Sequence, residues 1–280
     1  MSGCPEGPWL ALAGGGLHEG HITRMLEELA RCADQVLVET YTLTASEWLV
    51  DAVRGIAGEK VIEAHRSMLE EGAARLLERA GRGRVLVVVP GDPLIATTHR
   101  HLLAEARRRG IRTILVPGIS GVCAAKTVTG LDYYKYGRVV TAPGPWRMVK
   151  PYSVLEAIYG NMCLGLHTLL LLDIDPVSGS QLEPCRAVSM LRGLEAEIGS
   201  DILSRAEIIL VERAAMPGER ISLLRCPSTS GVAEPASLVI PGRLARYEAE
   251  ALADLHGVEA LGNAGLAAEA CGHYRRLSET

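Results

Sequence analysis

Short apolar runs rich in β-branched residues recur along the chain, and segments with helical spacing of their apolar residues separate them. The clearest run is RVLVVV at 84–89, which ends at Pro90 and is followed by a loop and a helix-like stretch of Arg, Ala and Leu. Strands that are buried on both faces and alternate with helices are typical of parallel sheets. The pattern therefore predicts an α/β fold with a largely parallel sheet.

Two series of strands and helices are expected, one in each half of the chain. The expected strands lie at 9–13, 35–40, 60–64, 84–89, 112–116, 137–142, 167–174, 207–214, 219–226 and 237–242. The expected helices include 24–33, 45–56, one long helix at 66–81, 119–130, 153–165, 183–197 and a terminal helix at 243–257. Prolines and glycines at 117–121 mark the best boundary. The sequence thus predicts two α/β domains, 1–116 and 117–280, with a cleft between them.

Composition narrows the class of protein. The 280 residues are 48% hydrophobic, which supports a substantial core. A net charge of -4 and a pI near 6.1 argue against a surface built to coat nucleic acid. No secretory signal is visible at the N-terminus, and the longest apolar run, at 163–172, is too short to span a bilayer. We expect a soluble, cytoplasmic protein with no membrane or nucleic-acid partner.

The cysteines carry no recognisable pattern. They are odd in number, widely scattered and never form a CxxC pair: Cys4, Cys32, Cys123, Cys163, Cys185, Cys226 and Cys271. Because neither a disulfide framework nor a zinc site shows this spacing, we expect mostly reduced thiols. The chain has only two Asn and two Gln. Depletion of these thermolabile amides is a trend of thermophiles, although a GC-rich genome also skews composition.

Three glycine-containing loops follow expected strands, at 13–21, 90–99 and 117–121. In open α/β sheets, ligands bind beyond the carboxyl ends of the strands. Glycine allows a close backbone approach to a ligand, although each loop alone is compatible with plain turn chemistry. The dinucleotide fingerprint G-x-G-x-x-G and the phosphate-binding loop G-x-x-x-x-G-K-[ST] are both missing from these loops. The loops therefore predict a ligand site of another kind.

Other catalytic patterns are weak. His99 and His101 would point to different faces of a helix, which argues against a shared metal. Ser120 lies in GISGV without an identifiable triad, which argues against a hydrolase. His167 begins an apolar strand and is either a semi-buried structural histidine or a binding residue. The residues alone thus leave the catalytic group unknown and predict no metal.

Four segments, taken in order, narrow the function further. They are GDPLIATTH (91–99), GLDYYKYG (130–137), KPYS (150–153) and GLHTLLLLDI (165–174). Together they resemble the diphthine synthases, a family of the tetrapyrrole-methylase class, and the match extends from HIT (21–23) to VIPGRLARYEAEAL (239–252). GDPL alone indicates only the wider class. The combination with GLHTLLLLDI is more specific.

This resemblance implies a fold and an activity. The family has two α/β domains of the tetrapyrrole-methylase type with S-adenosylmethionine in the cleft between them, and its members act as homodimers. They methylate the amino nitrogen of an aminocarboxypropyl-modified histidine on translation elongation factor 2 and release S-adenosylhomocysteine, without a metal. The implied cofactor contacts are Gly16 or its neighbour Leu17, Asp92, Ile95, Gly121, Val122, Leu172, Ala214 and Ala236.

Three positions depart from the family pattern. Ala13 stands at the first glycine of the first loop, Gly121-Val122 replaces Ser-Ile, and Ala236 replaces a frequent His. Contacts of this kind are largely backbone or van der Waals contacts, so replacement need not abolish them.

Two further roles and two rival functions stay open at this point. Asp92 either adds negative charge near a cationic ligand or only caps its turn. Arg147 and Lys150 either orient the carboxylate of the substrate or are solvated loop charges. The rival functions are a methylase that acts on a tetrapyrrole and a ligand-binding protein without catalysis.

Overall fold

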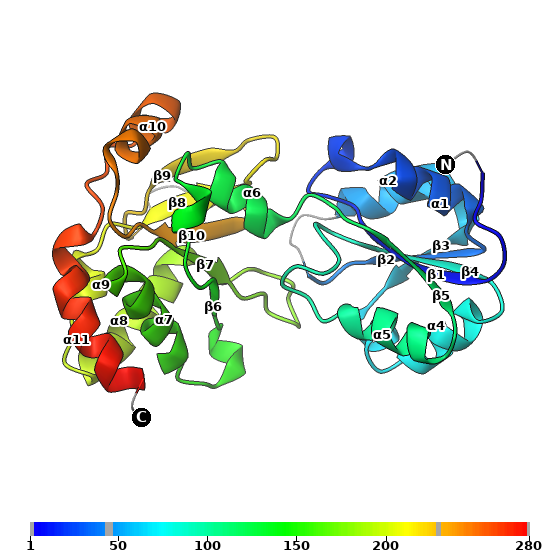
Figure 1. Ribbon diagram of the computed structural model, residues 1–280, viewed down its shortest axis with the longest axis horizontal. Coiled ribbons are helices and arrows are strands. Elements are labelled where there is room, and N and C mark those ends of the chain that lie inside the picture. The colour runs from blue at the N-terminus through cyan, green and yellow to red at the C-terminus, as the bar shows by residue number, and fades with distance from the viewer. Residues whose placement is uncertain (1–2, 43–46, 228–230, 279–280) are drawn as a thin grey trace. The chain divides into compact units, whose positions relative to one another are not determined.

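The computed structural model describes residues 3–42, 47–227 and 231–278, and it confirms the α/β class. The chain forms two compact units, residues 1–123 (unit 1) and residues 124–280 (unit 2) (Figure 1). The sequence predicts a domain boundary after residue 116, and the division between the compact units falls seven residues later, after Cys123. The boundary after residue 116 stays a prediction. No helix in the described ranges combines the length and the apolar character needed to cross a membrane.

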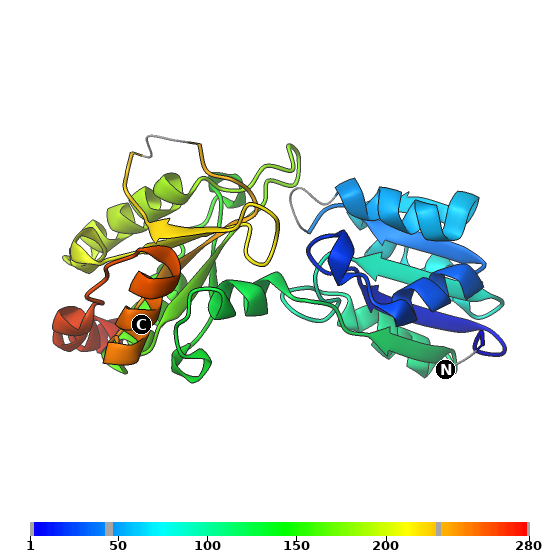
Figure 2. The ribbon, with the colours of Figure 1, turned by 90° about the horizontal axis from the view of Figure 1, so that it is seen from above.

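Unit 1 contains a parallel sheet with the strand order β3-β2-β4-β1-β5. Its strands are β1 (Trp9–Gly14), β2 (Gln35–Glu39), β3 (Val61–Ala64), β4 (Arg84–Val89) and β5 (Arg112–Val116). Figure 2 shows these strands side by side, from β3 at one edge to β5 at the other. The five strands predicted for the first half of the chain are confirmed.

Helices cover both faces of this sheet (Figure 1). Because successive strand residues point to opposite faces, Leu86 and Val88 of β4 pack with α1 and α2, while Val85, Val87 and Val89 pack with α4 and α5. The helices are α1 (Arg24–Cys32), α2 (Glu47–Ala57), α3 (Arg66–Leu69), α4 (Ala73–Ala80) and α5 (Arg100–Arg108). Burial on both faces explains why residues 85–89 (VLVVV) of this strand are all apolar.

The prediction of one long helix at 66–81 is wrong, because the chain turns between α3 and α4. Gly72 precedes α4, and its N–H donates to the carbonyl of Ser67 at 2.7 Å. A Cβ on this glycine would lie 2.8 Å from the carbonyl oxygen of Met68. The turn therefore needs glycine at this position. The helix predicted at 45–56 is α2, and the first two residues of that prediction lie outside the described residues.

The sheet of unit 2 has the strand order β6-β7-β10-β8-β9 and mixed direction. Its strands are β6 (Val140–Ala142), β7 (Thr168–Leu172), β8 (Ile209–Glu212), β9 (Arg220–Leu223) and β10 (Ala236–Ile240). β6 and β7 are parallel, whereas β10 runs antiparallel to β7 and β8, and β8 and β9 form a hairpin. The prediction of a largely parallel sheet is wrong for this unit, because a hairpin and a loop return the chain without crossover helices.

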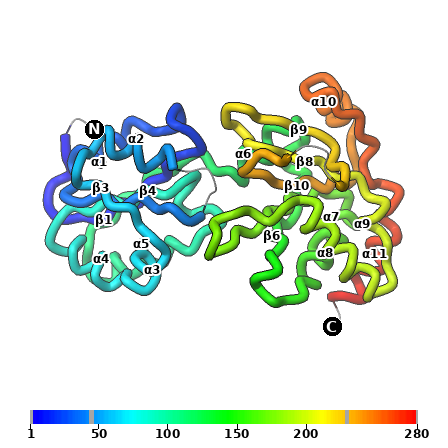
Figure 3. Tube along the Cα trace, turned by 180° about the vertical axis from the view of Figure 1, so that it is seen from behind, coloured from blue at the N-terminus to red at the C-terminus, as the bar shows by residue number. Residues whose placement is uncertain are grey.

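Most helices of unit 2 contribute to one hydrophobic core. The helices of unit 2 are α7 (Tyr152–Cys163), α8 (Pro184–Glu197), α9 (Ile202–Arg205), α10 (Arg246–His256) and α11 (Ala267–Ser278), and α6 (Gly121–Thr127) crosses the division between the units. Figure 3 shows α7, α8, α9 and α11 gathered on one side of the sheet, where their apolar residues share a core with β7, β8 and β10. The predicted terminal helix is α10, and the later helix α11, which packs on α7, was missed.

Short 3-10 helices complete the described elements. They are η1 (Glu19–His21), η2 (Gly58–Lys60), η3 (Tyr133–Lys135), η4 (Pro145–Arg147) and η5 (Ala264–Leu266).

The prediction of reduced thiols is wrong. All seven cysteines lie in the described ranges, and six of them form disulfide bonds: Cys4–Cys32, Cys163–Cys271 and Cys185–Cys226. The Cα–Cα distances are 5.5, 4.7 and 5.6 Å, within the range that a disulfide allows. The paired cysteines are separated by 28, 108 and 41 residues in the sequence. The tertiary structure brings them together, and no local spacing in the sequence could have predicted the pairs.

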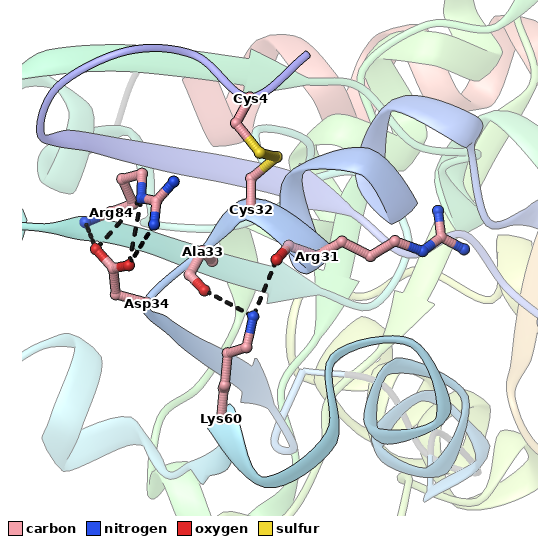
Figure 4. The surroundings of a disulfide bond; sticks show 7 residues. All are labelled: Cys4, Arg31, Cys32, Ala33, Asp34, Lys60 and Arg84. Carbon is pink, nitrogen blue, oxygen red and sulfur yellow. Dashed lines mark hydrogen bonds and ion pairs between the residues drawn. A yellow bond between two sulfur atoms is a disulfide. The ribbon is translucent and has the colours of Figure 1, made fainter. Parts of the chain in front are cut away.

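Figure 4 shows how Cys4–Cys32 ties the N-terminal segment to the last residue of α1. Beside it, the Nζ of Lys60 donates to the carbonyl oxygens of Arg31 and Ala33, at 2.9 and 3.1 Å. A cation at this position satisfies carbonyls at the helix C-terminus that have no partner within the helix. The disulfide and the ammonium group together fix this end of α1.

Candidate functional site

Three loops at the carboxyl edge of the unit 1 sheet pack backbone against backbone. They follow β1, β4 and β5, which are neighbours in the sheet. A Cβ on Gly14 would lie 2.4 Å from the carbonyl oxygen of Gly91, and a Cβ on Gly118 would lie 2.1 Å from the same atom. Only glycine fits at these two positions. The three glycine loops singled out in the sequence are therefore brought together at one edge.

Gly16 links the first loop to the second. Its N–H donates to the carbonyl of Gly91 at 3.2 Å, and the N–H of Gly91 donates back to Gly16 at 2.8 Å. Both residues have left-handed φ angles, 73° and 72°, which favour glycine. Leu17 is buried, and its Cδ2 would contact a Cβ on Gly121 at 3.6 Å. Gly16, Leu17 and Gly121, three of the predicted contacts, thus lie around the same loops.

Asp92 connects the second loop to the third. Its Oδ1 accepts from the N–H of Leu94 at 2.9 Å, and its Oδ2 accepts from the N–H of Gly118 at 3.1 Å. The residue therefore caps its own turn, as the plainer interpretation of the sequence held, and it also holds the loop after β5 in place. Each carboxylate oxygen retains a further lone pair that can accept from a ligand.

The remaining predicted residues of unit 1 differ in exposure. Ile95 is 39% exposed in the loop after Asp92. Val122 lies in the first turn of α6, and its N–H donates to the Oγ of Ser120 at 3.2 Å. Ser120 is thus a helix cap, which gives it a structural role in place of a nucleophilic one.

A buried polar cluster supports the second loop where it joins α5. The Nε2 of His99 lies 3.4 Å from both the Oε2 of Glu39 and the hydroxyl of Tyr41, and its Nδ1 is hydrogen-bonded to Thr97. Burial raises the pKa of Glu39, and burial lowers the pKa of His99 to about 4. The imidazole is therefore neutral near pH 7, and the cluster anchors the loop. His101, in contrast, is exposed on α5.

The predicted residues of unit 2 gather at one edge of its sheet. Leu172 ends β7, Ala236 begins β10, and Ser237 pairs with Leu171, so Leu172 and Ala236 face each other across the two strands. Ala214 follows the end of β8, whose Glu212 pairs with Ala236. The side-chain amide of Gln181 bonds both the N–H and the carbonyl of Ala236, at 2.7 and 2.9 Å. A ligand at Ala236 therefore meets apolar surface and no free backbone group of that residue.

The backbone on both sides of Ala214 is strained. Arg213 and Ala215 have left-handed φ angles of 51° and 54°, and each costs about 1 kcal/mol for a residue with a Cβ. Arg213 is held by a hydrogen bond from its N–H to the carbonyl of Pro235, at 2.8 Å. Strain of this kind clusters at functional sites. The sequence analysis missed Arg213, although a cation directly after the buried strand ILVE (β8) was a signal.

The two loop cations named in the sequence already have partners. Arg147 donates to both oxygens of Asp173, at 2.7 and 2.9 Å, and Lys150 donates to both oxygens of Glu197, at 2.9 and 2.7 Å. Burial opposes ionisation of Asp173, but hydrogen bonds, first that from Arg147, outweigh it and hold the pKa of that carboxyl below its usual range. A cavity of about 500 Å³ lies beside these residues. The loop is thus fixed by its own ion pairs.

His167 is a structural residue. It is fully buried, its Nε2 lies 2.9 Å from the Oε1 of Glu248, and its Nδ1 accepts from the N–H of Gly242 at 3.0 Å. Lys135 also donates to Glu248. Burial opposes ionisation of Glu248, but these bonds lower its pKa to about 2. Both ring nitrogens of His167 are occupied, so the binding role left open by the sequence is not supported.

Comparison with known proteins shows the family. Residues 10–226 match the family model of the tetrapyrrole (corrin/porphyrin) methylases. A diphthine synthase of Aeropyrum pernix is 42% identical over 262 residues, which cover 90% of this chain and 89% of that protein. This chain belongs to the diphthine synthase family. A diphthine synthase of Pyrobaculum aerophilum is 35% identical over 253 residues, which cover 88% of this chain and 97% of that protein.

Solved structures agree with this membership. A conserved hypothetical protein of Aeropyrum pernix K1 superposes with a TM-score of 0.87 and 38% identity, over 98% of each chain. A crystal structure of a diphthine synthase gives a TM-score of 0.77 and 29% identity, over 89% of this chain and 96% of that one. As a member of this family, the protein is an S-adenosylmethionine-dependent methyltransferase.

Proposed function

We propose that this diphthine synthase family member methylates the amino nitrogen of the aminocarboxypropyl-modified histidine of translation elongation factor 2. The similarity to a curated diphthine synthase over 90% of the chain carries this proposal. The glycine loops of unit 1 support it, since they are built for close backbone approach and lack the fingerprints of nucleotide-binding loops.

The residues present fit S-adenosylmethionine. We propose as contacts Gly16, Leu17, Asp92, Ile95, Gly121 and Val122 of unit 1 and Leu172, Ala214 and Ala236 of unit 2. The glycines let the loops pack with their backbones close together, and Asp92 offers negative charge to a cationic ligand. Leu172 and Ala236 offer buried apolar surface. The proposed contacts include no metal ligand set.

The bound cofactor would supply an electrophilic methyl group, and the protein supplies alignment. Methyl transfer is an in-line displacement, so fixed geometry accounts for much of the rate. Hydrogen bonds hold Asp92 to two loops, and paired backbone bonds hold Gly16 to Gly91, which makes the loops rigid. The accepting amine must lose its proton first, and surroundings of low polarity lower its pKa in that direction. We assign no general base.

The proposal also covers the cellular compartment, the oligomeric state and the partners of the protein. We propose a cytoplasmic homodimer that acts on the elongation factor, with no membrane or nucleic-acid partner. Disulfides are rare in the cytosol, but intracellular proteins of hyperthermophiles are an exception. The scarcity of Asn and Gln fits such a source. The disulfides are therefore compatible with a cytoplasmic enzyme.

The test is transfer of a labelled methyl group to three acceptors: elongation factor 2 with the aminocarboxypropyl arm, the factor without it, and a tetrapyrrole. We expect label only in the factor that carries the arm, because the reacting amine exists only there. Equal label in the unmodified factor, or label only in the tetrapyrrole, would contradict the proposed substrate and leave the methyltransferase class intact.

Asp92→Ala is expected to weaken S-adenosylhomocysteine binding by about tenfold, because two hydrogen bonds that hold the loops are lost. Calorimetry with a chelator present measures the affinity and also shows whether binding needs a metal. The matched control is Asp51→Ala, which removes a carboxylate that is 82% exposed on α2 and should leave the affinity unchanged. Equal affinities of the two variants would make Asp92 a turn residue only.

A further inference from the structure

Several cations lie at the carboxyl edge of the unit 2 sheet. β6 and β7 are parallel and β10 is antiparallel to both β7 and β8, so the carboxyl ends of β6, β7 and β8 share one edge. Most of the cations at this edge form ion pairs within the protein: Arg147 with Asp173, Lys150 with Glu197, and Arg220 with Glu212. Arg213, next to Ala214, is different: across the described parts of the chain, no carboxylate lies within ion-pair distance of its guanidinium.

The guanidinium of Arg213 packs against the turn after β8 and has no carboxylate partner among the described residues. Its Nε is buried and has no hydrogen-bond acceptor among the described residues. Its Nη1 and Cδ would lie 3.6 and 3.8 Å from a Cβ on Gly218, so the side chain packs over the turn between β8 and β9. A buried charged N–H without an acceptor destabilises the free protein. The Nη groups of the same guanidinium, which are not among the buried unpartnered atoms, are the donors that an anionic ligand would meet.

We propose that Arg213 binds the carboxylate of the aminocarboxypropyl arm and thereby sets the specificity for the modified histidine. This inference rests on the proposed function. The arm carries a carboxylate beside the reacting amine, and a guanidinium matches a carboxylate with two parallel hydrogen bonds. Arg213 lies next to a proposed cofactor contact, so a carboxylate bound there places the amine near the cofactor.

The positive charge has a second effect on the reaction. A cation beside the amine favours its neutral form, which is the nucleophile. Removing the charge should raise the pKa of the amine and move the acidic limb of the kcat/KM profile to higher pH. A residue with a purely structural role would not cause this shift.

The cofactor also carries an α-amino carboxylate, so the experiment separates the two sources. It compares Arg213→Gln and Arg213→Lys with the control Arg186→Gln, an exposed cation of α8. For Arg213→Gln we expect KM for the modified factor to rise about 10- to 100-fold, and the affinity for S-adenosylhomocysteine by calorimetry to stay within about twofold. Arg213→Lys should restore the pH profile but only part of the KM, because an ammonium lacks the planar fork.

Distinct results overturn the inference. An unchanged KM and pH profile in Arg213→Gln, with methyl transfer by the unsubstituted protein, would refute the role of Arg213. A weaker affinity for S-adenosylhomocysteine with an unchanged KM would assign the carboxylate to the cofactor and refute the acceptor assignment. Failure of the unsubstituted protein to label the modified factor would refute the proposed function itself. A thermal midpoint within about 2 °C of the parent shows that each variant is folded as the parent is.

Discussion

Gly118→Ala is expected to abolish detectable S-adenosylhomocysteine binding and to destabilise the protein by about 3 kcal/mol. The new Cβ would lie 2.1 Å from the carbonyl oxygen of Gly91 and 2.8 Å from the Cα of Gly14. These are backbone atoms of neighbouring loops, so no side-chain rotation can relieve the overlap. The loops after β1, β4 and β5 must separate, and the proposed contacts on them lose their alignment. Calorimetry and chemical denaturation measure the two effects.

The matched control for this glycine is Gly55→Ala. Gly55 is exposed in the middle of α2, and a Cβ there would have no described neighbour within 4 Å. Because alanine is favoured over glycine inside a helix, we expect this variant to be as stable as the parent or more stable by about 0.5–1 kcal/mol. Tight cofactor binding by Gly118→Ala would show that the loops adapt, and it would contradict the proposed site.

Removing the Cys163–Cys271 disulfide is expected to lower the free energy of unfolding by about 3–5 kcal/mol. The bond joins the last residue of α7 to α11 and closes a loop of 108 residues. A longer loop restricts the unfolded chain more, so this disulfide should contribute more than those separated by 28 and 41 residues. The variant Cys163→Ser with Cys271→Ser should therefore unfold about 10 °C below the parent in a thermal scan.

Cys123→Ser is the control for this experiment, since Cys123 lies outside the three disulfides. Its thermal midpoint should match that of the parent. Titration of thiols in the denatured protein should find one thiol before reduction and seven after it, in accordance with the seven cysteines of the sequence. Seven thiols before reduction would contradict the three disulfides and would support the reduced thiols that the sequence predicted.

The strands of unit 1 could be predicted because their environment is simple. A strand buried on both faces needs an apolar residue at every buried position, and β4 meets this requirement over residues 85–89 (VLVVV), after the partly exposed Arg84. The loops that follow these strands could be predicted for the same reason, since glycine and proline mark where the burial ends. The resemblance to the diphthine synthases then assigned a ligand to those loops.

The candidate site was predicted in part. The resemblance of the sequence to the diphthine synthases implied Gly16, Asp92 and Gly121 as cofactor contacts. The structure places all three residues at one edge of the unit 1 sheet. Nothing in the sequence indicated that the two oxygens of Asp92 would hold separate loops, or that Gln181 would occupy the backbone of Ala236. These bonds join residues far apart in the sequence, and no local pattern records them.

The sequence by itself determined the α/β class, all ten described strands and the family, because hydrophobic periodicity and short motifs are local properties. Only the tertiary structure decided the mixed direction of the second sheet, the disulfide partners and the unpaired state of Arg213 among the described residues. Each of these depends on which distant residues come within a few ångströms of one another. Arg147, Arg213 and Arg220 are the same residue type at the same sheet edge, yet among the described residues the carboxylates on or just after neighbouring strands neutralise only the first and the last.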